Sequence, residues 1–295
     1  MQEALRQVGD TTGFVMRERQ VATTNGNARI SFLVFEPMER AGFINAFSTR
    51  NGGTSSLPSG ALNLGQGNND DNENVAENRR RFLKAIGLEG TPLVTARQTH
   101  STDRCLIETP EQAHGFQPDC DAMTTKVTGI LLGIQTADCL PVLIADPKSG
   151  AMAAVHAGWR GTAGRITERA VADLMLRHGA NPRDCIAALG PAACGECYEV
   201  GDDVISRYKK EFGYWRALFS NFNKDGKAYL DVRAANVQQL KFCGLIEDRI
   251  HVTDYCTMHH SQFFFSHRRE GTASAVGTGR MLSVIGKAGL GENQT

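Results

Sequence analysis

One cysteine and one histidine, Cys139 and His156, stand in otherwise apolar segments on either side of a turn. The turn signal "DPKSG" at residues 146–150 predicts that the two segments form an antiparallel hairpin. If Ala145 pairs with Gly150, Cys139 and His156 lie directly opposite on one face, with Cβ atoms about 4.5–5.5 Å apart. A thiolate and an imidazole at that separation can share one zinc ion, through bonds of about 2.3 and 2.0–2.1 Å.

The register of this hairpin decides whether Cys139 and His156 lie on the same face of the sheet. A turn longer or shorter by one residue sends one of the two side chains to the opposite face. Pro141 lacks a ladder donor, so its strand is expected to be bulged or to lie at an edge of the sheet. Two simpler roles also stay open: a small buried residue for Cys139, and a histidine bonded to a backbone carbonyl for His156.

A catalytic zinc site needs three protein ligands and one open position. The segment "RQTHS" supplies His100 at the end of the predicted strand "PLVTARQTH". From that position the imidazole can point inward beside the hairpin. Spacing alone makes His100 a candidate third ligand and no more.

Several motifs together give this chain a resemblance to a known family. From about Phe43 to the C-terminus it resembles the YfiH-like family, also called the laccase-domain or polyphenol-oxidase-type family, through "STRNGG", "LNLG", "ENRRR", "RQTHS", "TADCLPVL", "AAVHAGWRGT", "LGPAACGECYEV" and "FFFSHRREGTASAVGTGR". The resemblance implies a single α/β domain with one zinc ion bound by His100, Cys139 and His156.

The resemblance also implies a function. Members of the family are described as purine nucleoside enzymes that phosphorolyse adenosine, inosine, guanosine and methylthioadenosine, with inorganic phosphate as co-substrate, and deaminate adenosine. Related bacterial proteins are implicated in peptidoglycan-precursor editing. The alternative is therefore a cysteine-type amidase with Cys139 as nucleophile and His156 as base. A third alternative is a binding module with a purely structural zinc.

The older name of the family, laccase, predicts copper, but the residues argue against it. Multicopper oxidases bind their metal mainly through histidines, many of them in His-x-His pairs. This chain has eight histidines and no His-x-His pair. A mixed set of two imidazoles and one thiolate suits zinc better.

Four further residues are candidates for the chemistry. Arg50 in "STRNGG" is the first choice for phosphate binding, because a guanidinium donates two parallel hydrogen bonds, although it can equally be a surface arginine beside a turn. Arg160 is the second choice, or else packs against the helix that follows. Asn63 can bind ribose or phosphate, but a local role in its loop is favoured. Asp138 is a candidate general base or orienting group, or a turn-forming aspartate.

Other residues resemble functional groups without a clear partner. "CGEC" places Cys194 and Cys197 at a redox-type spacing, but there is no second CxxC and Cys194 looks incidental. In "MHHSQ", His259 and His260 would point to opposite faces of a strand, and no function is assigned to them. In "FFFSHRR", His267 stands where the family commonly has tyrosine. Arg268 and Arg269 either contact substrate or form a solvated end, and the second interpretation is favoured.

The bulk composition narrows the class of protein. The chain of 295 residues has 41% hydrophobic and 22% charged residues, and its net charge is zero. This balance argues against nucleic acid as a partner and favours a small molecule. No apolar run is long enough to span a membrane, and no signal peptide precedes the eight scattered cysteines, so reduced thiols in the cytoplasm are expected.

The elements that would position these residues alternate between strands and helices. Helices are predicted in "NENVAENRRRFLKAIG", "TAGRITERAVADLMLRHG", "DDVISRYKKEFG" and "DVRAANVQQLKFCG", the last two each opened by a capping aspartate, and strands in "FLVFEP", "GILLGIQT", "CIAALGP", "RIHVTDYC" and "FFFSHRR". The expected fold is α/β (α+β), a single-domain mixed-sheet α/β sandwich over residues 31–295. Residues 1–30 are expected to be a weakly ordered extension.

Overall fold

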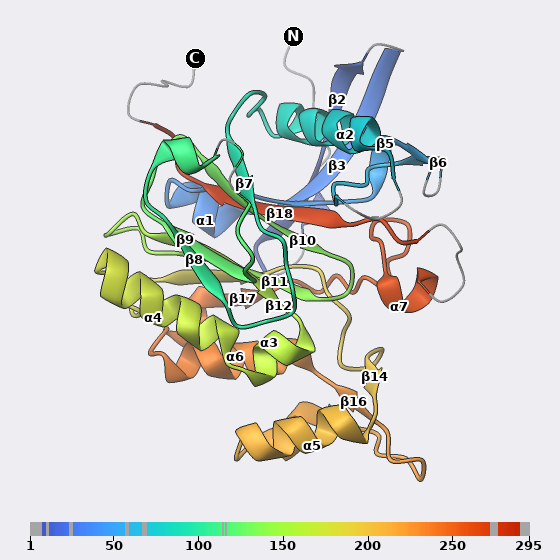
Figure 1. Cartoon of the computed structure of the whole chain (residues 1–295), viewed down its shortest axis with the longest axis vertical. Coiled ribbons are helices and arrows are strands. Elements are labelled where there is room, and N and C mark those ends of the chain that lie inside the picture. Colours follow the sequence, from blue (N-terminus) through green and yellow to red (C-terminus); the bar gives the residue numbers. More distant parts are fainter. Residues whose placement is uncertain are drawn as a thin grey trace.

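The computed structural model describes residues 8–9, 12–23, 26–56, 59–66, 70–113, 115, 117–271 and 277–289. Two large mixed sheets lie face to face and helices cover their outer faces, which gives a layered sandwich (Figure 1). The fold predicted from the sequence, a mixed-sheet α/β sandwich, is confirmed. No helix among the described residues is long and apolar enough to cross a membrane.

The first sheet has seven strands. Their spatial order is β1 (Val8–Gly9), β2 (Phe14–Thr23), β3 (Gly26–Phe35), β4 (Ile44–Ser48), β18 (Met281–Gly286), β10 (Leu131–Thr136) and β7 (Leu93–Thr95). Helix α2 (Asn72–Ala85) covers its outer face, where Phe82 packs with Phe32 and Val284. Two short strands, β5 (Asn51–Ser56) and β6 (Ser59–Ala61), pair beside it.

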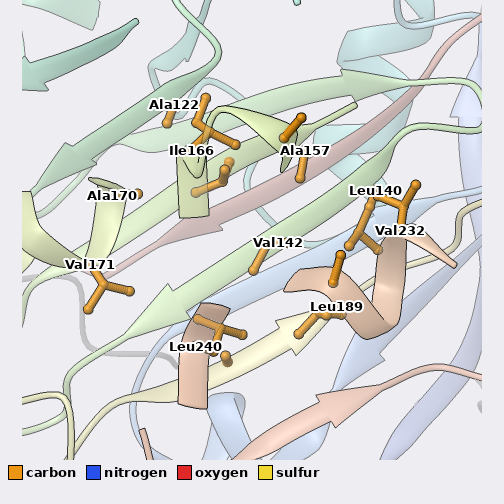
Figure 2. Close-up of a cluster of buried hydrophobic side chains, with 14 of the residues drawn as sticks. Ala122, Leu140, Val142, Ala157, Ile166, Ala170, Val171, Leu189, Val232 and Leu240 are labelled. Atoms are coloured by element: carbon orange, nitrogen blue, oxygen red, sulfur yellow. The ribbon is translucent and has the colours of Figure 1, made fainter. Parts of the chain in front are cut away.

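The second sheet has six strands and carries the predicted hairpin. Their order is β17 (Ile250–Val252), β13 (Ile186–Leu189), β11 (Leu140–Ala145), β12 (Met152–Ala157), β9 (Ala122–Thr125) and β8 (Arg104–Ile107). Helices α3 (Trp159–Ala163), α4 (Ile166–His178) and α6 (Val232–Phe242) contribute to the core on its outer face. Figure 2 shows Ile166, Ala170 and Val232 of these helices in the same buried cluster as Leu140 and Val142 of the sheet.

Strand β11 shows why the sequence around Cys139 is almost continuously apolar. Leu140, Val142 and Ile144 belong to the core beneath the helices, whereas Leu143 and Ala145 belong to the core between the two sheets. A strand that is buried on both faces has no solvent side, so hydrophobic residues do not alternate with polar ones.

The remaining elements are peripheral. Three short strands pair in the order β14 (Glu199–Val200), β16 (Ala228–Leu230) and β15 (Phe219–Ser220), and the other helices are α1 (Glu36–Arg40), α5 (Asp202–Glu211) and α7 (His267–Glu270). The four predicted helices are present as α2, α4, α5 and α6. Asp231 caps α6 by accepting a hydrogen bond from the Ala234 amide, but α5 begins after Gly201 without a side-chain cap.

The strand predicted for "FFFSHRR" is wrong. Phe264 and Phe265 lie buried in an irregular segment, and helix α7 begins directly after Ser266. The Ser266 hydroxyl accepts a hydrogen bond from the Arg269 amide, so the segment ends in a capped helical turn.

The prediction of a weakly ordered extension over residues 1–30 is also wrong where the structure describes them. β2 and β3 pair along their whole length, from Phe14 opposite Phe35 to Thr23 opposite Gly26, and Phe14 and Ile30 are fully buried. The expected boundary at residue 31 therefore falls inside β3. The sequence does not predict this hairpin because charged and polar residues occupy the middle of β2. Residues 1–7, 10, 11, 24 and 25 lie outside the described part of the chain.

The predicted turn is correct, but its register is two residues off. Ala145 pairs with Met152 instead of Gly150, and Pro141 pairs with His156. The turn lies one residue further along the chain than predicted, since the Asp146 amide bonds to the Ala151 carbonyl in this register. Since side chains alternate with a period of two, a shift of two residues keeps Cys139 on the same face as His156.

The expectation that Pro141 lies at an edge or a bulge is wrong too. β11 is an interior strand with β12 on one side and β13 on the other. The Pro141 carbonyl accepts a hydrogen bond from the Gly190 amide, which follows the last residue of β13. The missing donor of Pro141 therefore faces the end of β13, where only one ladder hydrogen bond is lost.

The burial of the N-terminal hairpin predicts that it contributes to the free energy of unfolding. Replacing Phe14, whose ring lies 4.9 Å from Phe35 and 5.7 Å from Phe47, with alanine should lower the free energy of unfolding by about 3–5 kcal/mol. Urea unfolding followed by circular dichroism measures the change. Gln20→Ala, at an exposed position of the same strand, should change it by less than about 0.5 kcal/mol. Equal stabilities for the two variants would contradict this assignment.

Candidate metal centre and its cavities

The structure brings together the three predicted metal ligands. The donor atoms of His100, Cys139 and His156 all lie within 4.8 Å of one another. His156 belongs to β12, Cys139 directly precedes β11, and His100 lies in the loop that follows β7. Two imidazoles and one sulfur converging on a single point form the ligand set of an open zinc site.

The backbone around these ligands is unusual. His100 has φ 58° and Asp138 has φ 84°, values that non-glycine residues rarely adopt. Gly158 faces both ligands, since a Cβ atom there would lie 2.9 Å from His100 Nδ1 and 3.1 Å from Cys139 Sγ. Strained residues at a cluster of ligands persist because the surrounding contacts enforce them, as is common at functional sites.

Asp121 is the functional residue that the sequence analysis missed. It directly precedes β9, is fully buried, and its Oδ1 accepts a 2.7 Å hydrogen bond from His156 Nδ1. The same carboxylate accepts hydrogen bonds from the amides of Thr99, His100 and Ser101 at 3.2, 3.0 and 2.7 Å. It therefore directs His156 Nε2 towards the cluster and holds the loop that carries His100. The only signal in the sequence is a carboxylate in "CDAM", at the start of an apolar strand.

The side chains of Cys139, His156 and Asp121 change one another's ionisation. Burial alone would raise the pKa of the Cys139 thiol, but the charge of His156 and hydrogen bonds from both histidines lower it to about 6. Burial opposes the charged form of His156, but the Cys139 thiolate and Asp121 raise the pKa of its imidazole. His156 and the Ser101 donors outweigh burial and lower the pKa of Asp121 to about 2. A thiolate at neutral pH is the form that binds a metal.

Asp138 is bound too tightly to resemble a free base. Its carboxylate accepts hydrogen bonds from the Thr257 hydroxyl at 2.6 Å, the Ser266 hydroxyl at 3.0 Å and the Arg268 amide at 2.6 Å. These donors belong to the segment that leads into α7. The geometry makes Asp138 the anchor of this segment beside Cys139, which favours the orienting role over proton transfer.

Two cavities meet at the metal centre. The aromatic cavity has a volume of about 320 Å³ and is lined by His100, Ala137, Asp138, Cys139, Ala157, Gly158, Trp159, Arg160, Ala193, Tyr198, Val232, His267 and Arg268. The arginine cavity has a volume of about 590 Å³ and is lined by Gln66, Ala96, Arg97, Gln98, His100, Gln117, Gln135, Thr136, Ala137, Cys139, His156, His267 and Arg280. His100, Ala137, Cys139 and His267 line both, so the two cavities adjoin at the cluster of ligands.

The predicted substrate-binding residues divide into two groups. Arg160 lines the aromatic cavity, with its guanidinium 4.3 Å from the centre of the Trp159 ring. Arg50 and Asn63 line neither cavity. Arg50 forms an ion pair of 2.6 Å with Glu270, and Asn63 is fully buried in its own loop, where its side chain bonds to Asp70 and to the backbone of Gly65. For Asn63 the local role is the one that the structure shows.

Two arginines that the sequence analysis did not choose for substrate binding, Arg280 and Arg268, line the cavities. Arg280 faces the arginine cavity, and its amide is held by the Asn63 side chain at 2.9 Å. Burial lowers the pKa of the Arg280 guanidinium, which is therefore poorly hydrated and favours a bound anion. Arg268 is exposed to solvent, and its guanidinium lies 4.9 Å from the centre of the Tyr198 ring on the wall of the aromatic cavity.

Comparison with known proteins identifies the family of this chain. The profile of a family described as "Multi-copper polyphenol oxidoreductase laccase" matches residues 44–288. The chain belongs to this laccase-domain family. A purine nucleoside phosphorylase of Deinococcus radiodurans is 40% identical over 243 residues, which cover 82% of this chain and 88% of the relative. Adenosine deaminase RL5, from an unknown prokaryotic organism, is 35% identical over 249 residues, 82% of this chain and 93% of the relative.

Solved structures of the laccase-domain family share the fold. The crystal structure of YlmD from Geobacillus stearothermophilus superposes with a TM-score of 0.79 at 30% identity, and covers 92% of this chain and 100% of that chain. The YfiH protein of Bacillus licheniformis superposes with a TM-score of 0.78 at 30% identity, over 87% of this chain and 96% of that chain. The resemblance read from the sequence motifs is confirmed.

The hydrogen bonds of Asp121 predict its effect on metal affinity. Asp121→Asn should lower zinc affinity by about 10–100-fold, since a carboxylate behind a histidine ligand fixes its tautomer and raises its basicity. Competition with a chromophoric chelator measures the affinity. Asp119→Asn is the matched control, because Asp119 is a nearby exposed aspartate paired with Arg97. The zinc affinity of this variant should equal that of the wild type. Equal affinities in both variants would remove Asp121 from the metal centre.

The lowered pKa of Cys139 predicts early alkylation in metal-free protein. Iodoacetamide should modify this thiol with a midpoint near pH 6, against about 8.5 for an ordinary cysteine. His156→Ala should move the midpoint upward, because burial then dominates. Peptide mapping separates Cys139 from Cys243, whose thiol pKa burial raises to about 11 and which serves as an internal control. A Cys139 midpoint at or above 8.5 would contradict the charged pair.

Proposed function

We propose that this protein is a zinc-dependent purine nucleoside enzyme. It would phosphorolyse adenosine, inosine, guanosine and methylthioadenosine with inorganic phosphate, and deaminate adenosine. The observation that carries the proposal is the convergence of His100, Cys139 and His156 at the junction of two cavities of different character. The names of the relatives, purine nucleoside phosphorylase and adenosine deaminase, agree with this choice of chemistry.

The residues present fit a zinc ion. A thiolate and two imidazoles are ligands that zinc prefers, and three protein ligands facing a cavity leave a fourth position for substrate or water. Asp121 behind His156 completes the arrangement common to zinc-binding histidines. Zinc at this position supplies a Lewis acid that polarises phosphate or activates a water molecule. The copper chemistry in the family description does not suit a set of one sulfur and two imidazoles without His-x-His pairs.

The aromatic cavity suits the purine base. Trp159 and Tyr198 offer flat ring surfaces, and Arg160 and Arg268 lie over those two rings. A purine inserted here is stacked and shielded from water, so that its glycosidic bond points towards the ligands shared by both cavities. His267 lines both cavities and is an imidazole placed to hold a proton near the departing base.

The arginine cavity suits phosphate and ribose. Arg280 supplies a buried positive charge, and the side chains of Gln66, Gln98 and Gln135 offer neutral donors and acceptors. Phosphate held at Arg280 would approach the sugar from the side opposite the stacked base, as displacement at C1′ requires. Arg280 replaces Arg50 as our first candidate for phosphate, because Arg50 is committed to Glu270. Asp138 positions the residues that lead into α7 beside this junction.

One observation favours a second function. Cys139, His156 and Asp121 form a chain of thiolate, imidazole and carboxylate, which is the arrangement of a cysteine hydrolase. The alternative is therefore a metal-free amidase that acts on peptidoglycan precursors. Activity of metal-free protein decides between the two: the zinc enzyme is inactive without metal, whereas a cysteine hydrolase retains its activity and loses it on alkylation.

Product analysis tests the proposal directly. Zinc-loaded protein is incubated with inosine or adenosine, with and without phosphate, and the products are separated by chromatography. Free hypoxanthine or adenine that depends on phosphate and disappears in Cys139→Ala would support phosphorolysis. Inosine formed from adenosine would support deamination. Cys243→Ala changes a cysteine outside both cavities and should keep full activity, and unchanged nucleosides with wild-type protein would refute the proposal.

Substitution of Arg280 tests the phosphate site. Arg280→Ala should raise the KM for phosphate about 10-fold or more, because a hydrogen bond to a charged group contributes about 1.5–3 kcal/mol, and should change the KM for nucleoside far less. Steady-state kinetics at varied phosphate measures both values. Arg216→Ala removes an arginine over Trp215, outside the cavities, and should leave both values unchanged. A parallel rise in both KM values for Arg280→Ala would place Arg280 elsewhere.

A further inference from the structure

A second group of metal-binding side chains lies outside the catalytic site. The donor atoms of Cys194, Cys197, Cys256 and His259 all lie within 4.8 Å of one another. Cys197 Sγ is 3.0 Å from His259 Nε2 and 3.9 Å from Cys256 Sγ, and Cys194 Sγ is 3.9 Å from His259 Nδ1. We refer to these four residues as the Cys3His cluster. The cavities of the proposed active site include none of them.

Backbone hydrogen bonds hold the two halves of the cluster in place. The amides of Cys197 and Tyr198 both donate to the Cys194 carbonyl, which closes a tight turn between the first two cysteines. Cys256 lies in a parallel bridge beside Ala192. Residues 257–259 then form a turn, so His259 is free of the strand geometry that would separate it from its neighbours. The convergence is thus a property of the fold around β13 and not of the four side chains alone.

The spacing fits four ligands around one ion. Thiolates bound to zinc at about 2.3 Å in a tetrahedral arrangement are separated by about 3.8 Å, close to the 3.9 Å between the Cys197 and Cys256 sulfurs. The Cys194 amide also donates to Cys256 Sγ at 3.4 Å, a contact that stabilises a thiolate. Three sulfurs and one imidazole are the ligand set of a closed, structural zinc site.

The surroundings provide access and favourable charge. A cavity of about 470 Å³ reaches the cluster and is lined by Cys194, Glu196, Asp231, Asp254, Cys256 and His259, together with neighbouring residues of β15 and β16. Three carboxylates beside an open path favour the entry of a divalent cation. A disulfide between Cys194 and Cys197 would account for two of the four groups and would leave the convergence of Cys256 and His259 unexplained.

We propose that Cys194, Cys197, Cys256 and His259 bind a second zinc ion, whose role is structural. The ion would tie the turn at 194–197 to the segment at 256–259. Both segments reach the catalytic site, since Ala193 and Tyr198 line the aromatic cavity and Thr257 donates to Asp138. The second ion would therefore fix one wall of that cavity from behind. This inference stands independently of the reaction proposed above.

Metal counting on the full chain tests the proposal. Purified wild-type protein should contain about two zinc ions per chain, and Cys139→Ala, with the Cys3His cluster intact, about one. X-ray absorption of zinc-loaded Cys139→Ala should report three sulfurs and one nitrogen, with Zn–S distances of about 2.3 Å. This variant leaves the four proposed ligands untouched, so the result does not depend on whether a damaged cluster still folds.

Paired histidine variants locate the ligand. In the Cys139→Ala background, His259→Ala should lose or weaken the remaining zinc and should no longer show a fall in Tm on addition of a chelator. His260→Ala changes the adjacent histidine and should retain the zinc and the chelator-dependent fall. Less than half a zinc per chain in Cys139→Ala after zinc loading, or a Cys194–Cys197 disulfide found by mass spectrometry in freshly purified protein, would overturn the proposal. Retention of zinc by His259→Ala with unchanged absorption would overturn the assignment of that ligand.

Discussion

The buried carboxylate of Asp121 is the constraint on which the candidate metal centre depends. It accepts hydrogen bonds from three consecutive amides, at Thr99, His100 and Ser101, and from His156 Nδ1. A loop that follows a strand of only three residues, β7, has no ladder of its own to satisfy those amides, so the carboxylate takes the place of a neighbouring strand. Because the carboxylate binds His156 Nδ1, the other ring nitrogen, Nε2, faces the cluster. One residue therefore sets the direction of two ligands from distant parts of the chain, and its own buried charge is balanced by the imidazole that it orients.

The sequence predicted the elements that follow a local pattern of apolar and turn residues. It did not predict those in which polar residues interrupt that pattern. The hairpin around residues 146–150 was foreseen because turn residues separate two apolar runs. Its register was off by two residues because Asp146 is opposite Ala151 and the turn lies one residue further along the chain. The ligand face was still correct because the period of a strand is two. β2 was missed because polar residues in its middle hide the buried Phe14. His100 and its role came from the family resemblance, since a ligand in a loop has no periodicity to reveal it.

The Cys3His cluster shows a different limit of sequence reasoning. A single CxxC has no local partner, and the other two proposed ligands follow about sixty residues later. His259 and His260 suggested opposite faces of a strand, but the segment is a turn, where neighbouring side chains do not alternate. The parallel bridge between Ala192 and Cys256 closes this distance, and only the order of strands around β13 determines it. The same bridge lies next to Ala193 and Thr257, so the second cluster and the wall of the aromatic cavity form one continuous piece of structure.

Electrostatics bear on how a chain without net charge could hold the phosphate that the proposed function requires. Without metal, the thiolate of Cys139 and the carboxylate of Asp121 outweigh the one positive charge that His156 carries, and the floor of the two cavities is negative. This single excess negative charge would oppose the attraction of phosphate to Arg280 and Arg268 on the walls. A divalent cation at the three ligands would displace the His156 proton and neutralise the charges of Cys139 and Asp121, and the arginines would then act on an anion without that opposition. The proposed ion would thus assist anion binding by removing the negative charge of the residues that hold it.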